Sequence, residues 1–172
     1  MSEHQKIVPC LWFDQNAEEA IECYVAAFNG SPHTRRDSRI VSLSRYEKGL
    51  EAPGTEHMLG KVITAIFELD GQRFMALDGG PIFKFTEAIS LYVECEDQEE
   101  VDYFWELLSA VPEAEQCGWV KDKFGLSWQV VPRQLGELMS RGGPEKALAV
   151  TNAMLKMKKL VVADLQEAFD EA

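Results

Sequence analysis

Apolar residues recur along the chain with two different periods, which together predict a mixture of strands and helices. The run IVPCLWF (7–13) predicts a first strand. The next segment, AEEAIECYVAAF (17–28), has apolar residues at helical spacing and begins with Glu18 and Glu19, which the helix dipole favours in a first turn. The alternating segment RIVSLSRY (39–46) then predicts a half-buried strand.

The same order of elements occurs a second time roughly 80 residues later. Between the two copies, KVITAIFELDGQRFMALDGG (61–80) predicts a β-hairpin with Asp70-Gly71 at its turn. AISLYVEC (88–95) then predicts a strand, and EDQEEVDYFWELLSA (96–110) a helix. Strands are expected again at 118–120 and within DKFGLSWQVVP (122–132). The repetition predicts a duplicated α+β module followed by C-terminal helices.

Charge and composition exclude several classes of partner. Lys and Arg number 17 against 29 Asp and Glu, which gives a formal charge of -12. Such a chain repels a phosphate backbone and an anionic bilayer, so we expect neither nucleic acid nor membrane as a partner. No apolar run approaches the roughly 20 residues that span a bilayer, and MSEHQKIVPC has no basic and apolar signal regions. We therefore expect a cytoplasmic protein.

The four cysteines do not indicate a metal ribbon or a redox pair. They are Cys10, Cys23, Cys95 and Cys117, which are far apart and form no C-x-x-C motif. Three of them lie within apolar patterns, where a small buried side chain is the ordinary interpretation. The three histidines are not spaced as metal ligands with one another or with a cysteine.

Four segments resemble the PhnB-like branch of the vicinal oxygen chelate superfamily, which includes glyoxalases, bleomycin-resistance proteins and extradiol dioxygenases. They are VPCLWFDQNAEEAIECYVAAF (8–28), MALDGGP (75–81), GWVKDKFGLSWQVVP (118–132) and NAMLKMKKLVVADLQ (152–166). The resemblance implies two βαβββ modules whose mixed sheets curl around a shared cleft, often in a homodimer. We accordingly expect a single domain over 1–172, with module one at about 5–81, module two at about 86–132 and a helical extension at about 133–172.

The resemblance also implies a divalent metal in the cleft, but the expected ligand positions do not supply it. The first-strand ligands fall near Pro9 and Ala88, and the last-strand glutamate falls on Gln129. A register slip of one residue brings in Cys10 or Ile89, and neither restores a set of His and Glu ligands. We therefore predict no cofactor: a divalent metal is possible, but these positions do not support it. Some members of the branch are described as quinone methyltransferases, yet no glycine-rich motif for a methyl donor follows the first strand.

If Pro9, Ala88 and Gln129 face the cleft, the alternation of side chains along each strand determines which other residues face it. The predicted lining is mainly apolar with a few polar side chains, as is usual for small-molecule pockets. The predicted ligand-binding residues are Leu11, Phe13, Asp78, Ser90, Tyr92, Ser127 and Gln129. Each also has a structural interpretation, such as a serine satisfied by the backbone or a tyrosine at a rim.

Asp78 and Gln129 are the candidate catalytic residues. Asp78 precedes Gly79-Gly80 after an apolar strand, and it is either a carboxylate at the mouth of the cleft or a turn aspartate that binds backbone N–H groups. Gln129 is an amide within an apolar strand and needs partners for both ends of its side chain.

Three functions are consistent with these features. The first is a metal-independent protein that binds a small-molecule ligand. The second is a glyoxalase-like isomerase or lyase that uses Asp78 and Gln129 on a small substrate. The third, an interaction module working through an acidic surface, has no motif behind it.

Overall fold

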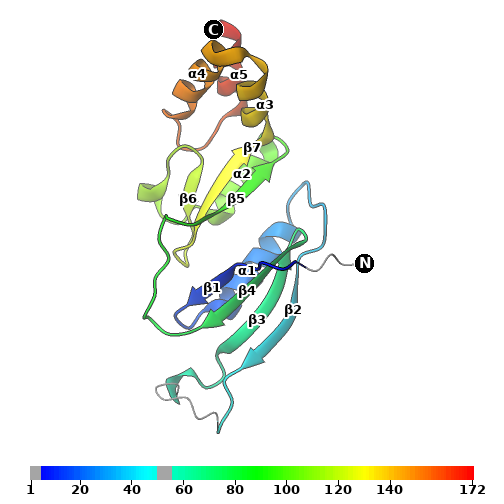
Figure 1. The fold of residues 1–172 in the computed structure, drawn as a ribbon, viewed down its shortest axis with the longest axis vertical. Helices are drawn as coiled ribbons and strands as arrows, with labels where there is room; N and C mark the ends of the chain where they lie inside the picture. The colour runs from blue at the N-terminus through cyan, green and yellow to red at the C-terminus, as the bar shows by residue number, and fades with distance from the viewer. Residues whose placement is uncertain (1–4, 50–55) are drawn as a thin grey trace. The chain divides into compact units, whose positions relative to one another are not determined.

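A computed structural model of the protein describes residues 5–49 and 56–172. The chain divides into two compact units, Met1–Lys84 and Phe85–Ala172. Each unit combines one mixed β-sheet with helices (Figure 1). This arrangement confirms the predicted α+β class.

Within residues 5–49 and 56–84, the N-terminal unit contains a four-stranded sheet and one α-helix. Its elements are β1 (Cys10–Phe13), α1 (Ala17–Asn29), β2 (Arg39–Arg45), the 3-10 turn η1 (Glu56–Met58), β3 (Val62–Leu69) and β4 (Gln72–Asp78). The strands lie in the order β1-β4-β3-β2, with β1 parallel to β4 and the other pairs antiparallel. Asp70 and Gly71 have φ values of 45° and 90°, as a two-residue hairpin turn requires, so the predicted hairpin is confirmed.

The start of α1 is held by a residue from the other end of the unit. The side chain of Asn16, at the N-cap position, makes no capping bond. Instead, Asp78 Oδ1 accepts the Ala17 N–H at 2.8 Å, and Asp78 Oδ2 accepts the Val62 N–H at 2.9 Å. One buried carboxylate therefore joins α1, β3 and β4.

The C-terminal unit repeats the order with one strand fewer. It contains β5 (Ser90–Cys95), α2 (Gln98–Leu108), the 3-10 turn η2 (Pro112–Ala114), β6 (Trp119–Lys121) and β7 (Ser127–Pro132). The sheet order is β5-β7-β6, and β5 is parallel to β7 just as β1 is to β4. Asp97 caps α2 by accepting the Glu100 N–H at 3.0 Å, and the Glu100 carboxylate accepts the Glu96 N–H at 2.7 Å.

Three further helices complete this unit, namely α3 (Arg133–Arg141), α4 (Gly143–Met154) and α5 (Val162–Glu171). Figure 1 shows them gathered together beyond the end of β7. Their shared core contains Leu135, Leu138, Val150, Leu160, Leu165 and Phe169, together with Val131 of β7. The segment between α4 and α5 also binds the start of β6, since Cys117 N–H donates to Met157 O at 2.9 Å and Gly118 N–H donates to Lys158 O at 2.8 Å. The helical extension is thus part of the C-terminal unit.

Among the described helices, none combines the length and the apolar character that crossing a bilayer requires.

Candidate functional site

The turn before β7 determines which way the side chains of that strand point. Asp122 Oδ1 accepts the N–H groups of Phe124 at 2.8 Å and Leu126 at 3.0 Å, and Oδ2 accepts the indole N–H of Trp128 at 2.8 Å. Gly125 supplies the positive φ of 89° that this turn needs. Trp128 is thereby fixed in the core, where it is 1% exposed, and Gln129 points to the opposite face of the sheet.

That opposite face carries most of the polar residues predicted for the site. Helix α2 contacts all three strands, and the alternating residues Val93, Cys95, Trp128 and Val130 are buried. The ladder places Tyr92 and Trp119 beside Gln129, and Ser90 and Lys121 beside Ser127. We call this set the polar face, and its members are Ser90, Tyr92, Trp119, Lys121, Ser127 and Gln129.

Gln129 has a defined partner on the polar face. Its Nε2 group donates to Ser90 Oγ at 2.8 Å, and both side chains are half-buried. The predicted placement of Ser90 and Gln129 on one face of the sheet agrees with this contact. Ser127 is 1% exposed, and its Oγ has no hydrogen-bond partner within the described part of the chain.

The remaining members border this polar centre. Tyr92 is 56% exposed, and partial burial, followed by the nearby Glu94 and Cys95, raises the pKa of its phenol. Lys121 forms an ion pair with Glu87, and the hydrogen bond from Lys121 is the main cause that lowers the pKa of Glu87. The two serines and the Gln129 amide are therefore bordered by two aromatic rings and by a lysine whose charge is offset by an ion pair with Glu87.

Strand β1 points the other way from the sequence prediction. Leu11 and Phe13 are 6% and 2% exposed, and they pair with Ala76 and Asp78. Because the Asp78 carboxylate binds the first residue of α1, this is the face that α1 covers. The prediction that Leu11 and Phe13 face a cleft is wrong. It assumed that the Pro9 side chain points into the cleft, and because side chains alternate along a strand, an error of one residue at Pro9 reverses the face assigned to Leu11 and Phe13.

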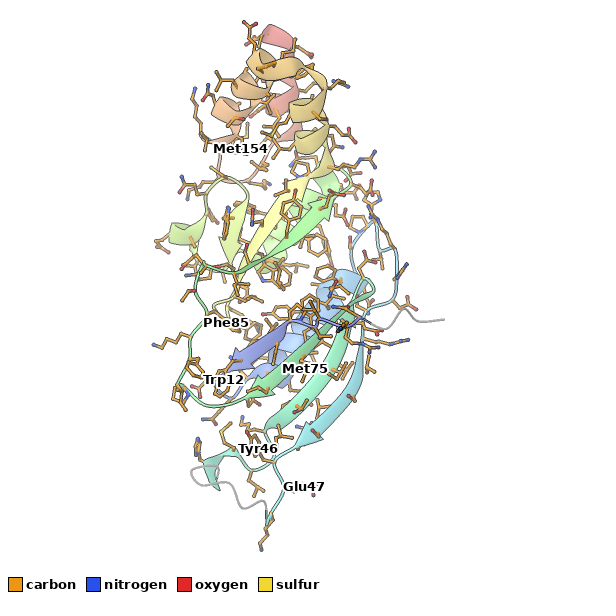
Figure 2. All side chains as sticks on the ribbon, viewed as in Figure 1. Trp12, Tyr46, Glu47, Met75, Phe85 and Met154 are labelled. Carbon is orange, nitrogen blue, oxygen red and sulfur yellow. The ribbon has the colours of Figure 1, made fainter. Side chains whose placement is uncertain are left out.

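The other face of this sheet carries residues that the sequence prediction did not select. Trp12 donates its indole N–H to Gly80 O at 2.9 Å and meets Phe83 edge-on at a centroid distance of 5.0 Å. A Cβ atom on Gly79 would lie 2.1 Å from the Trp12 ring, so the glycine is required for the indole to lie there. Figure 2 shows Trp12 on β1 and Met75 on β4. The glycine pair of MALDGGP was the signal for a closely packed ring.

Asp78 has the contacts of the second interpretation given above, a turn aspartate that binds backbone N–H groups. It is 1% exposed, and both of its carboxylate oxygens accept N–H bonds from Ala17 and Val62. Its backbone carbonyl also accepts the Tyr46 hydroxyl at 3.1 Å. The residue thus links several elements of the N-terminal unit.

The residues at the expected metal positions do not fit a divalent metal. Pro9 offers its carbonyl to Met75 N–H at 2.8 Å, Ala88 lies in a turn before β5, and the Gln129 amide binds Ser90. In the N-terminal unit, Cys10, which a one-residue slip brings to the first-strand position, lies beside Met75 in the ladder of β1 and β4. The Cys10 side chain is exposed, yet partial desolvation raises the pKa of its thiol, so the thiolate that binds metals is not favoured. Across residues 5–49 and 56–172, no group of three His, Cys, Asp or Glu side chains is placed to hold a metal ion.

A separate open pocket of ≈ 450 Å³ lies beside α1 in the N-terminal unit. Its polar lining is largely engaged within the protein: the Glu18 carboxylate pairs with Arg45 at 2.6 Å, and Lys61 donates to Gln15 O at 3.0 Å. This pocket contains none of the predicted site residues except Asp78.

Two units with parallel first and last strands and one helix-covered face define a fold of the glyoxalase type. The chain belongs to the PhnB-like family described as 3-demethylubiquinone-9 3-methyltransferase, which matches residues 5–131. This confirms the family predicted from the sequence. The helical extension after residue 132 lies beyond the matched region.

Solved structures agree with this assignment. The PhnB protein from Bacillus cereus is 38% identical, the match covers 74% of this chain and 99% of that one, and the TM-score is 0.59. Protein PA1353 from Pseudomonas aeruginosa is 20% identical over 74% of this chain and 97% of its own, with a TM-score of 0.51, which shows a shared fold. No curated protein matches the chain.

Proposed function

We propose that this protein binds a small molecule without a metal, on the polar face of its C-terminal unit. The observation that carries the proposal is the hydrogen bond from Gln129 Nε2 to Ser90 Oγ at the position where the superfamily has a metal-binding glutamate. Tyr92 and Trp119 lie beside this pair and supply ring surface. A few polar groups among aromatic side chains are typical of small-molecule sites.

The direction of this hydrogen bond explains the amide. A glutamate at position 129 offers only acceptor oxygens when it is ionised, whereas glutamine also has an N–H donor. Here the Gln129 N–H donates to Ser90 Oγ, so the site contains a neutral hydrogen-bonded pair instead of a carboxylate that could bind a cation. A neutral amide also compensates a dication poorly, so any metal held here is expected to bind weakly.

Metal analysis is the first test of the proposal. Protein purified without chelators should contain far less than one divalent metal ion per chain, and added Zn²⁺, Ni²⁺ or Mn²⁺ should leave its thermal unfolding unchanged. One tightly bound metal ion per chain would contradict metal-independent binding.

Ligand screening is the second test. Compounds from a small-molecule library should perturb the NMR signals of the Gln129 side-chain amide and the Trp119 indole. Gln129→Ala should weaken their binding, while Gln72→Ala, at an exposed glutamine in the N-terminal unit, should not. A library that leaves the polar face unperturbed would refute the proposal.

The contacts favour neither of the two enzymatic alternatives. The isomerase or lyase hypothesis places Asp78 and Gln129 in the active site, but the Asp78 carboxylate is buried and bound to two backbone N–H groups, and the Gln129 amide donates to Ser90. A methyltransferase needs a site for its methyl donor, and the connection from β1 to α1, Asp14-Gln15-Asn16, contains no glycine to cradle one.

We retain the homodimer as part of the proposal, because it follows from the family resemblance. Analytical ultracentrifugation should show a mass of two chains, and a monomer at all concentrations would remove this part alone.

A further inference from the structure

Ser127 is a buried hydroxyl whose position is not explained by contacts within the protein. It is 1% exposed, and its Oγ has no hydrogen-bond partner in the described part of the chain. Buried polar groups are nearly always paired, so an orphaned one marks a place where a partner from outside is expected. The alternation of β7 directs Ser127 to the same face as Gln129.

Ser90 provides a second donor next to Ser127. The two residues are opposite each other in the parallel ladder of β5 and β7, whose strands lie roughly 4.8 Å apart. Ser90 Oγ already accepts a hydrogen bond from Gln129, so its own proton remains to be donated. Because Ser127 is 1% exposed, the side chains that cover it must move aside before a ligand oxygen can lie about 2.7 Å from each hydroxyl and accept from both serines.

The surrounding charges decide what kind of oxygen fits. Lys121 lies beside Ser127, but its ammonium group is paired with Glu87. Glu94 follows Tyr92 by two positions on β5 and so lies on the same face. With one cation offset by one carboxylate and a second carboxylate nearby, the face does not favour an anion. A neutral carbonyl oxygen, which has two lone pairs, matches the two donors better than a carboxylate.

We propose that Ser90 and Ser127 together bind the carbonyl oxygen of a neutral, planar ligand whose ring lies against Tyr92 and Trp119. This inference rests on the proposed function and adds the chemical class of the ligand. Gln129 acts as the positioning residue, because its bond to Ser90 Oγ turns the Ser90 proton toward the ligand.

Three probes of similar size test the class of ligand, namely acetophenone, benzoate and ethylbenzene. Titrations followed by the NMR signals of Gln129 and Trp119 should show that acetophenone binds about tenfold more tightly than ethylbenzene, as a retained hydrogen bond predicts. Benzoate should bind more weakly than acetophenone. Equal affinities for all three, or a preference for benzoate, would overturn the carbonyl assignment while leaving small-molecule binding intact.

Ser127→Ala separates a binding role from a structural one. Removing an orphaned buried hydroxyl should raise the melting temperature of the free protein and also abolish the preference for acetophenone over ethylbenzene. Ser140→Ala, at an exposed hydroxyl on α3, should change neither property. A Ser127→Ala protein that is less stable, or that still prefers acetophenone, would overturn the inference.

Discussion

Asp78 makes contacts that are out of proportion to its size. Its two oxygens bind Ala17 N–H and Val62 N–H, and neither nitrogen has water to replace the lost partner because the carboxylate is buried. Removing such an acceptor leaves buried donors unsatisfied, which costs more than the net value of the bonds themselves.

Asp78→Ala should therefore lower the free energy of unfolding by roughly 2–4 kcal/mol, the sum expected for a lost helix cap and a second buried bond. Urea unfolding measures the loss. Asp37→Ala, at an exposed aspartate, is the matched control and should change stability by less than about 0.5 kcal/mol. An unchanged midpoint for Asp78→Ala would show that the carboxylate is dispensable for the fold.

The residue types of the site were readable from the sequence, but their partners were not. The departure of Gln129 from a metal-binding glutamate is visible in DKFGLSWQVVP. Its bond to Ser90 depends on the register between two strands that are 39 positions apart, and no local pattern encodes that register. Asp78 was a candidate catalytic residue because it is a carboxylate at the end of an apolar strand. The same position explains its structural role, since a buried carboxylate needs hydrogen-bond donors.

Strand β1 shows how a single element can be predicted correctly while its faces are reversed. The segment is apolar on both faces. It contains Pro9, whose fixed φ and missing N–H make it a poor position from which to assign the alternation of side chains. With hydrophobic residues on each side, the pattern of Cys10 to Phe13 gives no preference for the helix-covered face. The polar residues of β5 and β7 removed that ambiguity in the second copy.

The glycine that accommodates Trp12 gives a prediction for the edge formed by β1 and β4. Gly79→Ala places a methyl group 2.1 Å from the indole ring carbons, so the ring must move and its bond to Gly80 O is lost. We expect a loss of stability of about 1–3 kcal/mol, as overpacking typically causes. Gly136→Ala in α3, an exposed helical glycine with open space around it, should instead stabilise by about 0.5–1 kcal/mol. Thermal unfolding distinguishes the two directions.

Strands β2, β3 and β4 share an ion-pair group whose effect depends on pH. Glu68 pairs with Arg73 at 2.9 Å and Arg39 at 3.0 Å, and the hydrogen bond from Arg73 is the main cause that lowers the pKa of Glu68 below its ordinary value of 4.5. Since the folded protein favours the ionised form, this stabilisation is present above 4.5 and is lost as the pH falls through the lowered pKa.

Glu68→Gln should therefore be less stable than the natural protein at pH 7 and equally stable once the pH falls below the folded-state pKa of Glu68. Urea unfolding across this range measures the convergence. A difference that persists unchanged at the acid end would mean that the pairs with Arg39 and Arg73 do not cause it.

At the scale of the whole molecule, the duplicated order of elements was predictable because both copies repeat a strand, a helix and further strands. The helical extension was also visible as an amphipathic tail. Its attachment was not, because it relies on backbone bonds from Cys117 and Gly118 to the segment between α4 and α5. Backbone hydrogen bonds of this kind do not depend on particular side chains, so the sequence does not reveal them. The one indication is Gly118, whose φ is 86°.

Because this extension shares a core with Val131 of β7, its packing should support the C-terminal sheet. Leu165→Ala, at a fully buried position, should destabilise the C-terminal unit by about 2–5 kcal/mol. Hydrogen exchange should show faster exchange in β6 and β7, and unchanged protection in β3 and β4 of the N-terminal unit. Unchanged protection of β6 and β7 would mean that the extension is an independent appendage.

The carboxylate of Asp78 also has a consequence for the order in which the chain is made. It lies 61 residues after the N–H of Ala17 that it accepts. During synthesis, Ala17 is added to the chain about 3–12 seconds before Asp78, at the usual rate of about 5–20 residues per second. The first turn of α1 therefore stays frayed on the nascent chain, and the N-terminal unit closes only when β4 arrives. A ribosome stalled before residue 78 should hold a chain in which that turn is unprotected.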